Sequence, residues 1–89
     1  MEGINLEITK PNYRRYILKT DKCAGRIVLE KYDDVWNLEL MNVSPQNQGY
    51  GTMFLSKVLE NENLKAENMT VCPISVESAR FFKRNGFKL

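Results

Sequence analysis

The sequence contains no histidine among its 89 residues, and this absence removes several kinds of active site. Histidine is the commonest general base, and it activates the nucleophile in Ser/His and Cys/His sites. The two cysteines, Cys23 and Cys72, are far apart and have no histidine partners, so no metal site is predicted. They are expected to be reduced thiols in a cytoplasmic protein, because the first residues do not form a signal peptide.

Long apolar runs and a strong charge imbalance are also missing. No apolar stretch approaches the roughly 20 residues that a membrane-spanning helix needs, so no membrane partner is expected. The formal net charge is only +2, whereas a nucleic-acid-binding protein usually carries a dense basic stripe, which makes nucleic acid an unexpected partner. The length fits one small domain, residues 1–89, near the lower size limit for a self-sufficient core.

Hydrophobic periodicity predicts strands in the first half of the chain and two helices in the second. Alternating apolar residues favour an antiparallel meander, and i, i+4 spacing favours helices. A short apolar strand between the helices is predicted to be central and parallel to the strand before it, because a β-α-β unit makes a right-handed crossover. The predicted class is α+β (α/β) with a mixed sheet in the order β-β-β-β-α-β-α. The predicted strands are 4–9, 13–18, 24–32, 35–43 and 69–72, the helices are about 49–60 and 75–85, and 87–89 could start a last strand.

The loop between Val43 and Thr52 joins a predicted strand to a predicted helix and is polar and glycine-rich. Backbone N–H groups exposed at a helix N-terminus form an anion site, and phosphate is its usual ligand. A Walker A loop needs lysine after its last glycine, but Thr52 follows Gly51 here. A dinucleotide-binding fingerprint needs a third small residue where this chain has Phe54, so that interpretation fails as well.

What remains is Gln46-x-x-Gly49-x-Gly51, and this pattern resembles the acyl-CoA-binding loop of the GNAT superfamily of N-acyltransferases. A second segment is similar to the closing motif of the same family, Asn-x-x-Ala-x-x-Phe-Tyr-x-x-x-Gly-Phe. Phe81, Gly86 and Phe87 match this motif, whereas Ser75, Ser78 and Phe82 stand where Asn, Ala and Tyr are usual. Helix-capping preferences alone also explain two of these residues. Ser75 is a predicted helix N-cap, and Gly86 is the glycine predicted to end the helix.

The resemblance implies a GNAT-like fold that binds acetyl-CoA and transfers the acyl group directly to a primary amine. Pantetheine would pair with the main chain of Met41 and Val43, in an opening between two splayed parallel strands. Ser75 stands where the family uses Asn to hydrogen-bond the pantetheine amide, and Phe82 would pack on pantetheine or the core. The pyrophosphate would be bound by the N–H groups of Gln48, Gly49, Tyr50, Gly51 and Thr52.

The chain departs from the family in ways that bear on catalysis. The helices that normally help to form the acceptor site have no room near Lys10, so the site is either open to a large acceptor such as a protein or completed by a second copy of the chain. Phe82 replaces the tyrosine that acts as general acid. Glu39 is the predicted general base; by alternation it shares a face with Asn37, Met41 and Val43, and the alternative is a solvated cross-strand charge. The alternative function is therefore a non-catalytic CoA-binding or protein-interaction module.

Overall fold

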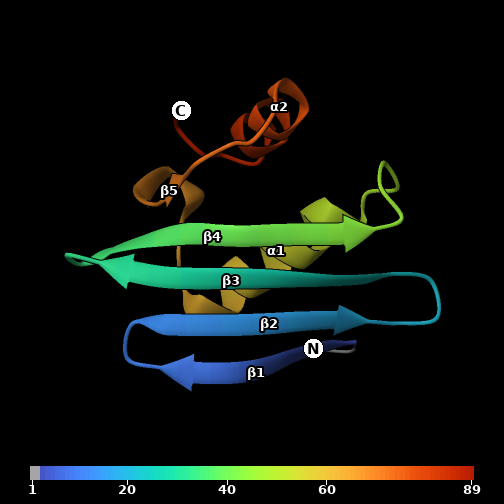
Figure 1. Ribbon diagram of the computed structural model, residues 1–89, viewed down its shortest axis with the longest axis horizontal. Coiled ribbons are helices and arrows are strands. Elements are labelled where there is room, and N and C mark those ends of the chain that lie inside the picture. Colours follow the sequence, from blue (N-terminus) through green and yellow to red (C-terminus); the bar gives the residue numbers. More distant parts are fainter. Residues whose placement is uncertain (1–2) are drawn as a thin grey trace.

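The computed structural model describes residues 3–89. These residues form an α+β domain with a five-stranded mixed sheet and two helices (Figure 1). Neither helix in this part of the chain is long and apolar enough to cross a membrane. In chain order the elements are β1 (Ile4–Lys10), β2 (Tyr13–Lys19), β3 (Ala24–Tyr32), β4 (Val35–Ser44), α1 (Tyr50–Glu62), a 3-10 turn (Ala66–Asn68), β5 (Thr70–Val71) and α2 (Val76–Arg84).

The first four strands form the predicted antiparallel meander, in the order β1-β2-β3-β4. The tight turn between β3 and β4 is made by Asp33 and Asp34, which have φ values of 48° and 65°. Two consecutive residues with positive φ are the signature of a hairpin turn whose twist matches that of the flanking strands. The predicted limits of these four strands differ from the observed ones by no more than a residue.

The prediction of a central strand at 69–72 is wrong, because β5 has two residues and lies at the edge of the sheet. It pairs in parallel with β4 only through Asn37↔Thr70 and Leu38↔Val71. Pro73 follows closely and has no N–H group to donate to a ladder, which stops the strand early. Residues 87–89 form no strand either.

The core lies between the sheet and α1, which passes behind the strands in Figure 1. The opposite face of the meander carries no helix in that view. Four apolar residues of α1 are buried at the spacing that the sequence predicts: Phe54, Leu55, Val58 and Leu59. They pack with sheet residues such as Ile27 and Leu29, both fully buried, and with Phe82 of α2.

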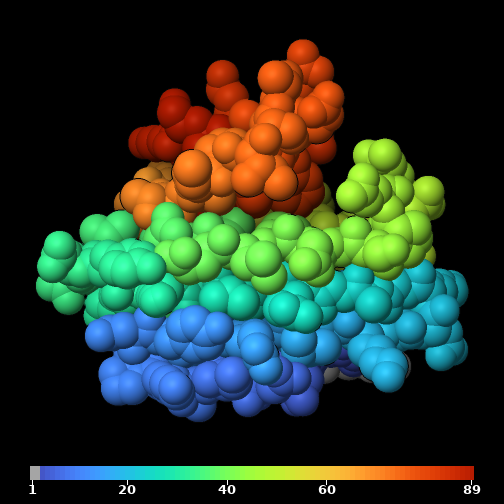
Figure 2. All heavy atoms as spheres, in the orientation of Figure 1, coloured from blue at the N-terminus to red at the C-terminus, as the bar shows by residue number. Residues whose placement is uncertain are grey.

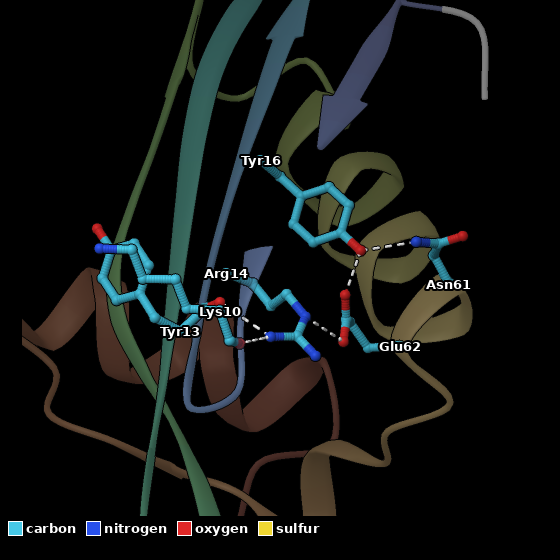
Figure 3. Close-up of polar contacts among 6 residues, drawn as sticks. All are labelled: Lys10, Tyr13, Arg14, Tyr16, Asn61 and Glu62. Atoms are coloured by element: carbon cyan, nitrogen blue, oxygen red, sulfur yellow. Dashed lines mark hydrogen bonds and ion pairs between the residues drawn. The ribbon is translucent and has the colours of Figure 1, made fainter. Parts of the chain in front are cut away.

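A polar network fastens the last turn of α1 to β2 (Figure 3). The buried Tyr16 hydroxyl donates to the Glu62 carboxylate and accepts a hydrogen bond from Asn61 Nδ2 at 2.7 Å. Arg14 Nε lies 3.2 Å from Glu62 Oε1, and its guanidinium sits 5.2 Å from the centre of the Trp36 ring. Burial, followed by the hydrogen bond to Glu62, raises the pKa of Tyr16 to about 12. Glu62 is 46 residues away from Tyr16 in the sequence, so no local pattern indicates this contact.

Candidate functional site: a cleft at the start of the first helix

A cleft of about 460 Å³ lies where the end of β4, the first turn of α1 and α2 come together. Figure 2 shows the surface hollowed between the yellow-green loop that precedes α1 and the orange segment that leads into α2. The lining residues come from these three elements and from the loops that join them. They are Met41, Asn42, Val43, Pro45, Gln46, Asn47, Gly49, Gly51, Thr52, Ile74, Ser75, Glu77, Ser78, Phe81, Phe82 and Arg84.

The cleft exists because β4 continues after its pairing with β5 has ended. The last β4 residue paired to β5 is Leu38, and β4 runs on to Ser44. Past Val71 the chain turns away through Cys72 and Pro73 toward α2. Within residues 3–89, no strand covers the outer edge of β4 from Glu39 onward. That stretch of main chain therefore offers hydrogen-bonding groups toward the cleft.

The first turn of α1 brings free backbone donors to the same place. The first N–H groups of any helix have no partner inside the helix, and side chains usually cap them. Here Gly49 occupies the N-cap position with a φ of 80°, no side chain caps the helix, and its first turn contains no acidic residue. A Cβ atom on Gly49 would have no atom within 4 Å, so the space beside these donors is open.

The two glycines of the loop motif have different roles in the structure. Gly49 has a positive φ, whereas Gly51 lies inside α1 and does not. A Cβ atom on Gly51 would lie 3.3 Å from the Phe81 ring and 3.5 Å from Met41 Cε. The missing side chain at Gly51 therefore lets α2 pack closely against the start of α1.

Most of the predicted cofactor-binding residues come together in this cleft. Two do not line it: the exposed Gln48, and Tyr50, whose side chain packs against the core. For Tyr50 only the backbone N–H, in the first turn of α1, can serve the site. The predicted residues that do line the cleft are Met41, Val43, Gly49, Gly51, Thr52, Ser75 and Phe82.

Ser75 is the predicted N-cap of α2. Its Oγ accepts a hydrogen bond from the Ser78 amide at 3.0 Å, and Ser78 Oγ accepts from the Ser75 amide at 3.0 Å, which makes a capping box. The cap uses the Ser75 oxygen as an acceptor and does not use the hydroxyl proton. A ligand in the cleft could therefore still accept a hydrogen bond from Ser75.

Phe82 packs mainly in the core, which is one of its two predicted positions. Its side chain is buried, and its ring makes edge-on contacts with Phe81 and Phe87, both with centroids 5.4 Å away. At its cleft-facing edge it presents only ring carbon and no proton donor. The glycine end of α2 is confirmed as well, because Gly86 has a φ of 98° and the Phe87 amide donates to the Phe82 carbonyl at 3.0 Å.

Glu39 does not line the cleft, and the predicted alternation around it is wrong. β4 pairs with β3 through Leu38 and Leu40, and Glu39 is the extra residue of a β-bulge. A bulge reverses the side-chain alternation beyond it. Met41 and Val43 consequently pack on the core side, whereas Glu39 lies beside Asn37 and accepts a hydrogen bond from Asn37 Nδ2 at 3.0 Å.

The surroundings of Glu39 are polar and exposed. Asn37 Oδ1 accepts from Thr70 Oγ1 at 2.6 Å, which links β4 to β5 beside the bulge. The hydrogen bond from Tyr32 to Glu39 is the largest of the effects that raise the pKa of Tyr32 to about 12. Glu39 thus stands on the helix-free face of the sheet, next to the point where β4 and β5 separate.

The sequence pattern did not assign Glu77 or Phe81 of the cleft wall to a ligand. Glu77, Phe81 and Arg84 follow the i, i+4, i+7 spacing of one helix face and line the cleft together. This spacing, read from Ser75 as the N-cap, could have identified them. Arg84 and Glu77 are the charged side chains of the lining, so most polar contacts there come from main chain and neutral groups.

Comparison with known proteins gives no match: no family model fits the sequence, and no curated protein or solved structure is significantly similar to it. Within the part of the chain that the structure describes, no group of three or more metal-ligating side chains is found.

Proposed function

We propose that this protein binds an acyl-CoA, with acetyl-CoA as the expected donor, and transfers the acyl group to a primary amine. One observation carries the proposal. The uncapped N-terminus of α1 opens into a cleft of about 460 Å³ beside the uncovered edge of β4. The start of α1 suits the diphosphate of CoA, and the uncovered edge of β4 suits its pantetheine arm.

The diphosphate of CoA would bind at the start of α1. Several backbone N–H groups and the positive end of the helix dipole favour an anion at this position. Thr52 adds a hydroxyl to the lining, and Arg84 adds a positive charge from α2. No acidic side chain in the first turn of α1 opposes the negative charge of the ligand.

Pantetheine would extend from the diphosphate along β4. It contains two amide groups, which need partners when they leave water. The main chain of Met41 and Val43 offers them, because the edge of β4 is uncovered at this position. The apolar lining from Val43, Ile74 and Phe81 suits the methylene groups of the same ligand.

The resemblance to the GNAT superfamily supports the same ligand. Both of its motifs contribute to the wall of the cleft: Gly49 and Gly51 from the loop, and Ser75 and Phe82 from α2. A mixed sheet in which two parallel strands part next to a helix N-terminus is the arrangement that the resemblance implies.

For acyl transfer, the acceptor amine must lose a proton before it attacks the thioester carbonyl. The C–S bond then breaks, and CoA leaves as a thiolate that takes a proton from solvent. A bulge re-aims the main chain and is over-represented next to active sites. Glu39 at the bulge is our candidate for the group that accepts the amine proton. The acceptor would then approach over the helix-free face of the sheet, where a protein side chain as well as a small amine has access.

A second candidate function, acyl-CoA binding without transfer, is favoured by Phe82. An aromatic ring without a hydroxyl cannot protonate the leaving thiolate, and Phe82 offers only ring carbon to the cleft. The same cleft would then serve as a ligand-binding or protein-interaction module.

Two measurements test these functions separately. Isothermal titration with acetyl-CoA measures binding, and mass spectrometry of amine mixtures incubated with the protein and acetyl-CoA measures transfer. Binding with transfer supports the enzyme, and binding without transfer supports the second function. If CoA and acetyl-CoA fail to bind at millimolar concentration, both proposals are wrong.

Glu39→Gln tests the proposed base. We expect transfer to slow by roughly 100-fold, the usual lower range for loss of a general base, while CoA affinity stays unchanged because Glu39 lies outside the cleft. Glu30→Gln is the matched control, since Glu30 pairs with Asn37 on the same face. Equal rates for the two variants would remove Glu39 from the mechanism.

A further inference from the structure

A second hollow of about 530 Å³ lies at one end of the sheet, over strands β2, β3 and β4. It shares three residues with the cleft at the start of α1: Asn42, Val43 and Gln46. The end of β4 therefore forms a wall that is common to the cleft and the hollow. Its other lining residues are Ile17, Leu18, Lys19, Ala24, Gly25, Arg26 and Ser44.

The hollow is positively charged. Lys19 and Arg26 both line it, and none of its lining residues is acidic. The ion pairs found among residues 3–89 use other cations, namely Arg14, Arg15 and Lys31. Lys19 and Arg26 are thus exposed cations without an ion-pair partner in the described chain, and they face the same space.

The register of the strands brings these two cations together. Arg26 pairs with Ile17 of β2 and Asn42 of β4, and Lys19 pairs with Ala24. Since directly paired residues share a face, and residues two apart on a strand do too, Lys19, Arg26 and Asn42 lie on one side of the sheet. Asn42, Ser44 and Gln46 add neutral hydrogen-bonding groups around the two charges.

We propose that this hollow is a second anion site, in which Arg26 and Lys19 bind a phosphate or carboxylate of a ligand that also contacts the end of β4. The proposal deepens the proposed function and rests on it for the identity of the ligand. The anion would be either the 3′-phosphate of CoA or an acidic group on the acceptor amine. Arginine suits both, because its planar guanidinium donates two parallel hydrogen bonds to phosphate or carboxylate oxygens.

Titration with CoA and with 3′-dephospho-CoA distinguishes the two sources. If the anion is the 3′-phosphate, Arg26→Gln weakens CoA binding by about threefold to tenfold, the range of a partly exposed charged hydrogen bond, and leaves dephospho-CoA binding unchanged. If the acceptor supplies the anion, both nucleotides bind Arg26→Gln as they bind the wild type. In that case O-phosphoethanolamine binds the CoA-saturated wild type more tightly than ethanolamine does, and Arg26→Gln removes the difference.

Arg80→Gln is the matched control, because Arg80 is exposed on α2 and lines neither hollow nor cleft. The proposal of an anion site is wrong if Arg26→Gln and Arg80→Gln bind both nucleotides and both amines with the same affinities. If the wild type does not bind CoA at all, the proposed function fails by itself. The anion site is then decided by titrating inorganic phosphate and following the side-chain N–H signals of Arg26 by NMR: a saturating shift supports the site, and no shift overturns it.

Discussion

The Phe81 ring lies 3.3 Å from the point where a Cβ atom of Gly51 would stand. This contact joins α2 to the first turn of α1 and sets the width of the cleft between them. Because the contact is already close, a larger residue at position 51 must push α2 outward or displace the ring. The packing of these two helices and the shape of the proposed ligand site are thus coupled through one missing side chain.

The first prediction concerns this contact. Gly51→Leu should lower the free energy of unfolding by about 1–3 kcal/mol, the usual cost of overpacking, as measured by urea denaturation. Phe81→Ala in the same chain makes room, so the double variant should be more stable than the sum of the two single changes predicts. Strict additivity of the two effects would show that Gly51 and Phe81 do not compete for the same space.

The second prediction concerns Tyr16 at alkaline pH. Its pKa is raised from 10.0 to about 12 in the folded chain, so the folded state keeps a proton that the unfolded state releases. Its stabilising effect is therefore complete below pH 10 and is lost as pH rises toward 12. Over that interval the free energy of unfolding should fall by about 2–3 kcal/mol from this group.

The variant Tyr16→Phe tests this loss of stability at alkaline pH. The variant is less stable near neutral pH, because Glu62 and Asn61 lose their shared partner, but its stability should fall less steeply between pH 10 and 12. Parallel curves for wild type and variant over this interval would mean that Tyr16 titrates at its ordinary pKa in the fold.

The third prediction concerns the start of α2. Ser75→Ala removes the acceptor of the Ser78 amide and should cost about 0.5–2 kcal/mol of unfolding free energy. Ser75→Asp keeps an acceptor at the N-cap and should restore most of that stability, although its charge should weaken CoA binding in the cleft. Equal stability of the Ala and Asp variants would rule out a capping role for Ser75.

The sequence predicted the meander, both helices and the ends of α2 well, because each is encoded locally. Alternation marks the strands, and Ser75 and Gly86 mark the limits of α2. Sequence-based prediction failed where the geometry depends on segments that are far apart in the chain. The Glu39 bulge depends on the pairing of two strands, the place of β5 depends on where the chain leaves β4, and the role of Gly51 depends on Phe81, 30 residues away.

For the candidate site, the sequence predicted where most of the residues gather but not what each residue does there. The loop motif located the helix start, and seven of the nine predicted cofactor-binding residues line one cleft. The local pattern could not separate backbone from side-chain roles. Tyr50 illustrates this, because its side chain packs against the core while its amide lies in the first turn of α1. Lys19 and Arg26 carry no motif, and only the strand register brings them together.

The central claim, that the start of α1 binds the CoA diphosphate, is tested most directly by titrating CoA into Thr52→Glu and Ser56→Glu. Both residues are exposed on α1 and both changes add one negative charge, but only Thr52 lines the cleft. A carboxylate in the first turn favours the helix by up to about 1 kcal/mol, so Thr52→Glu should fold as well as the wild type. We predict that Thr52→Glu weakens CoA binding by at least about tenfold, whereas Ser56→Glu changes it less than about twofold. Equal CoA affinity of the two variants would contradict the account.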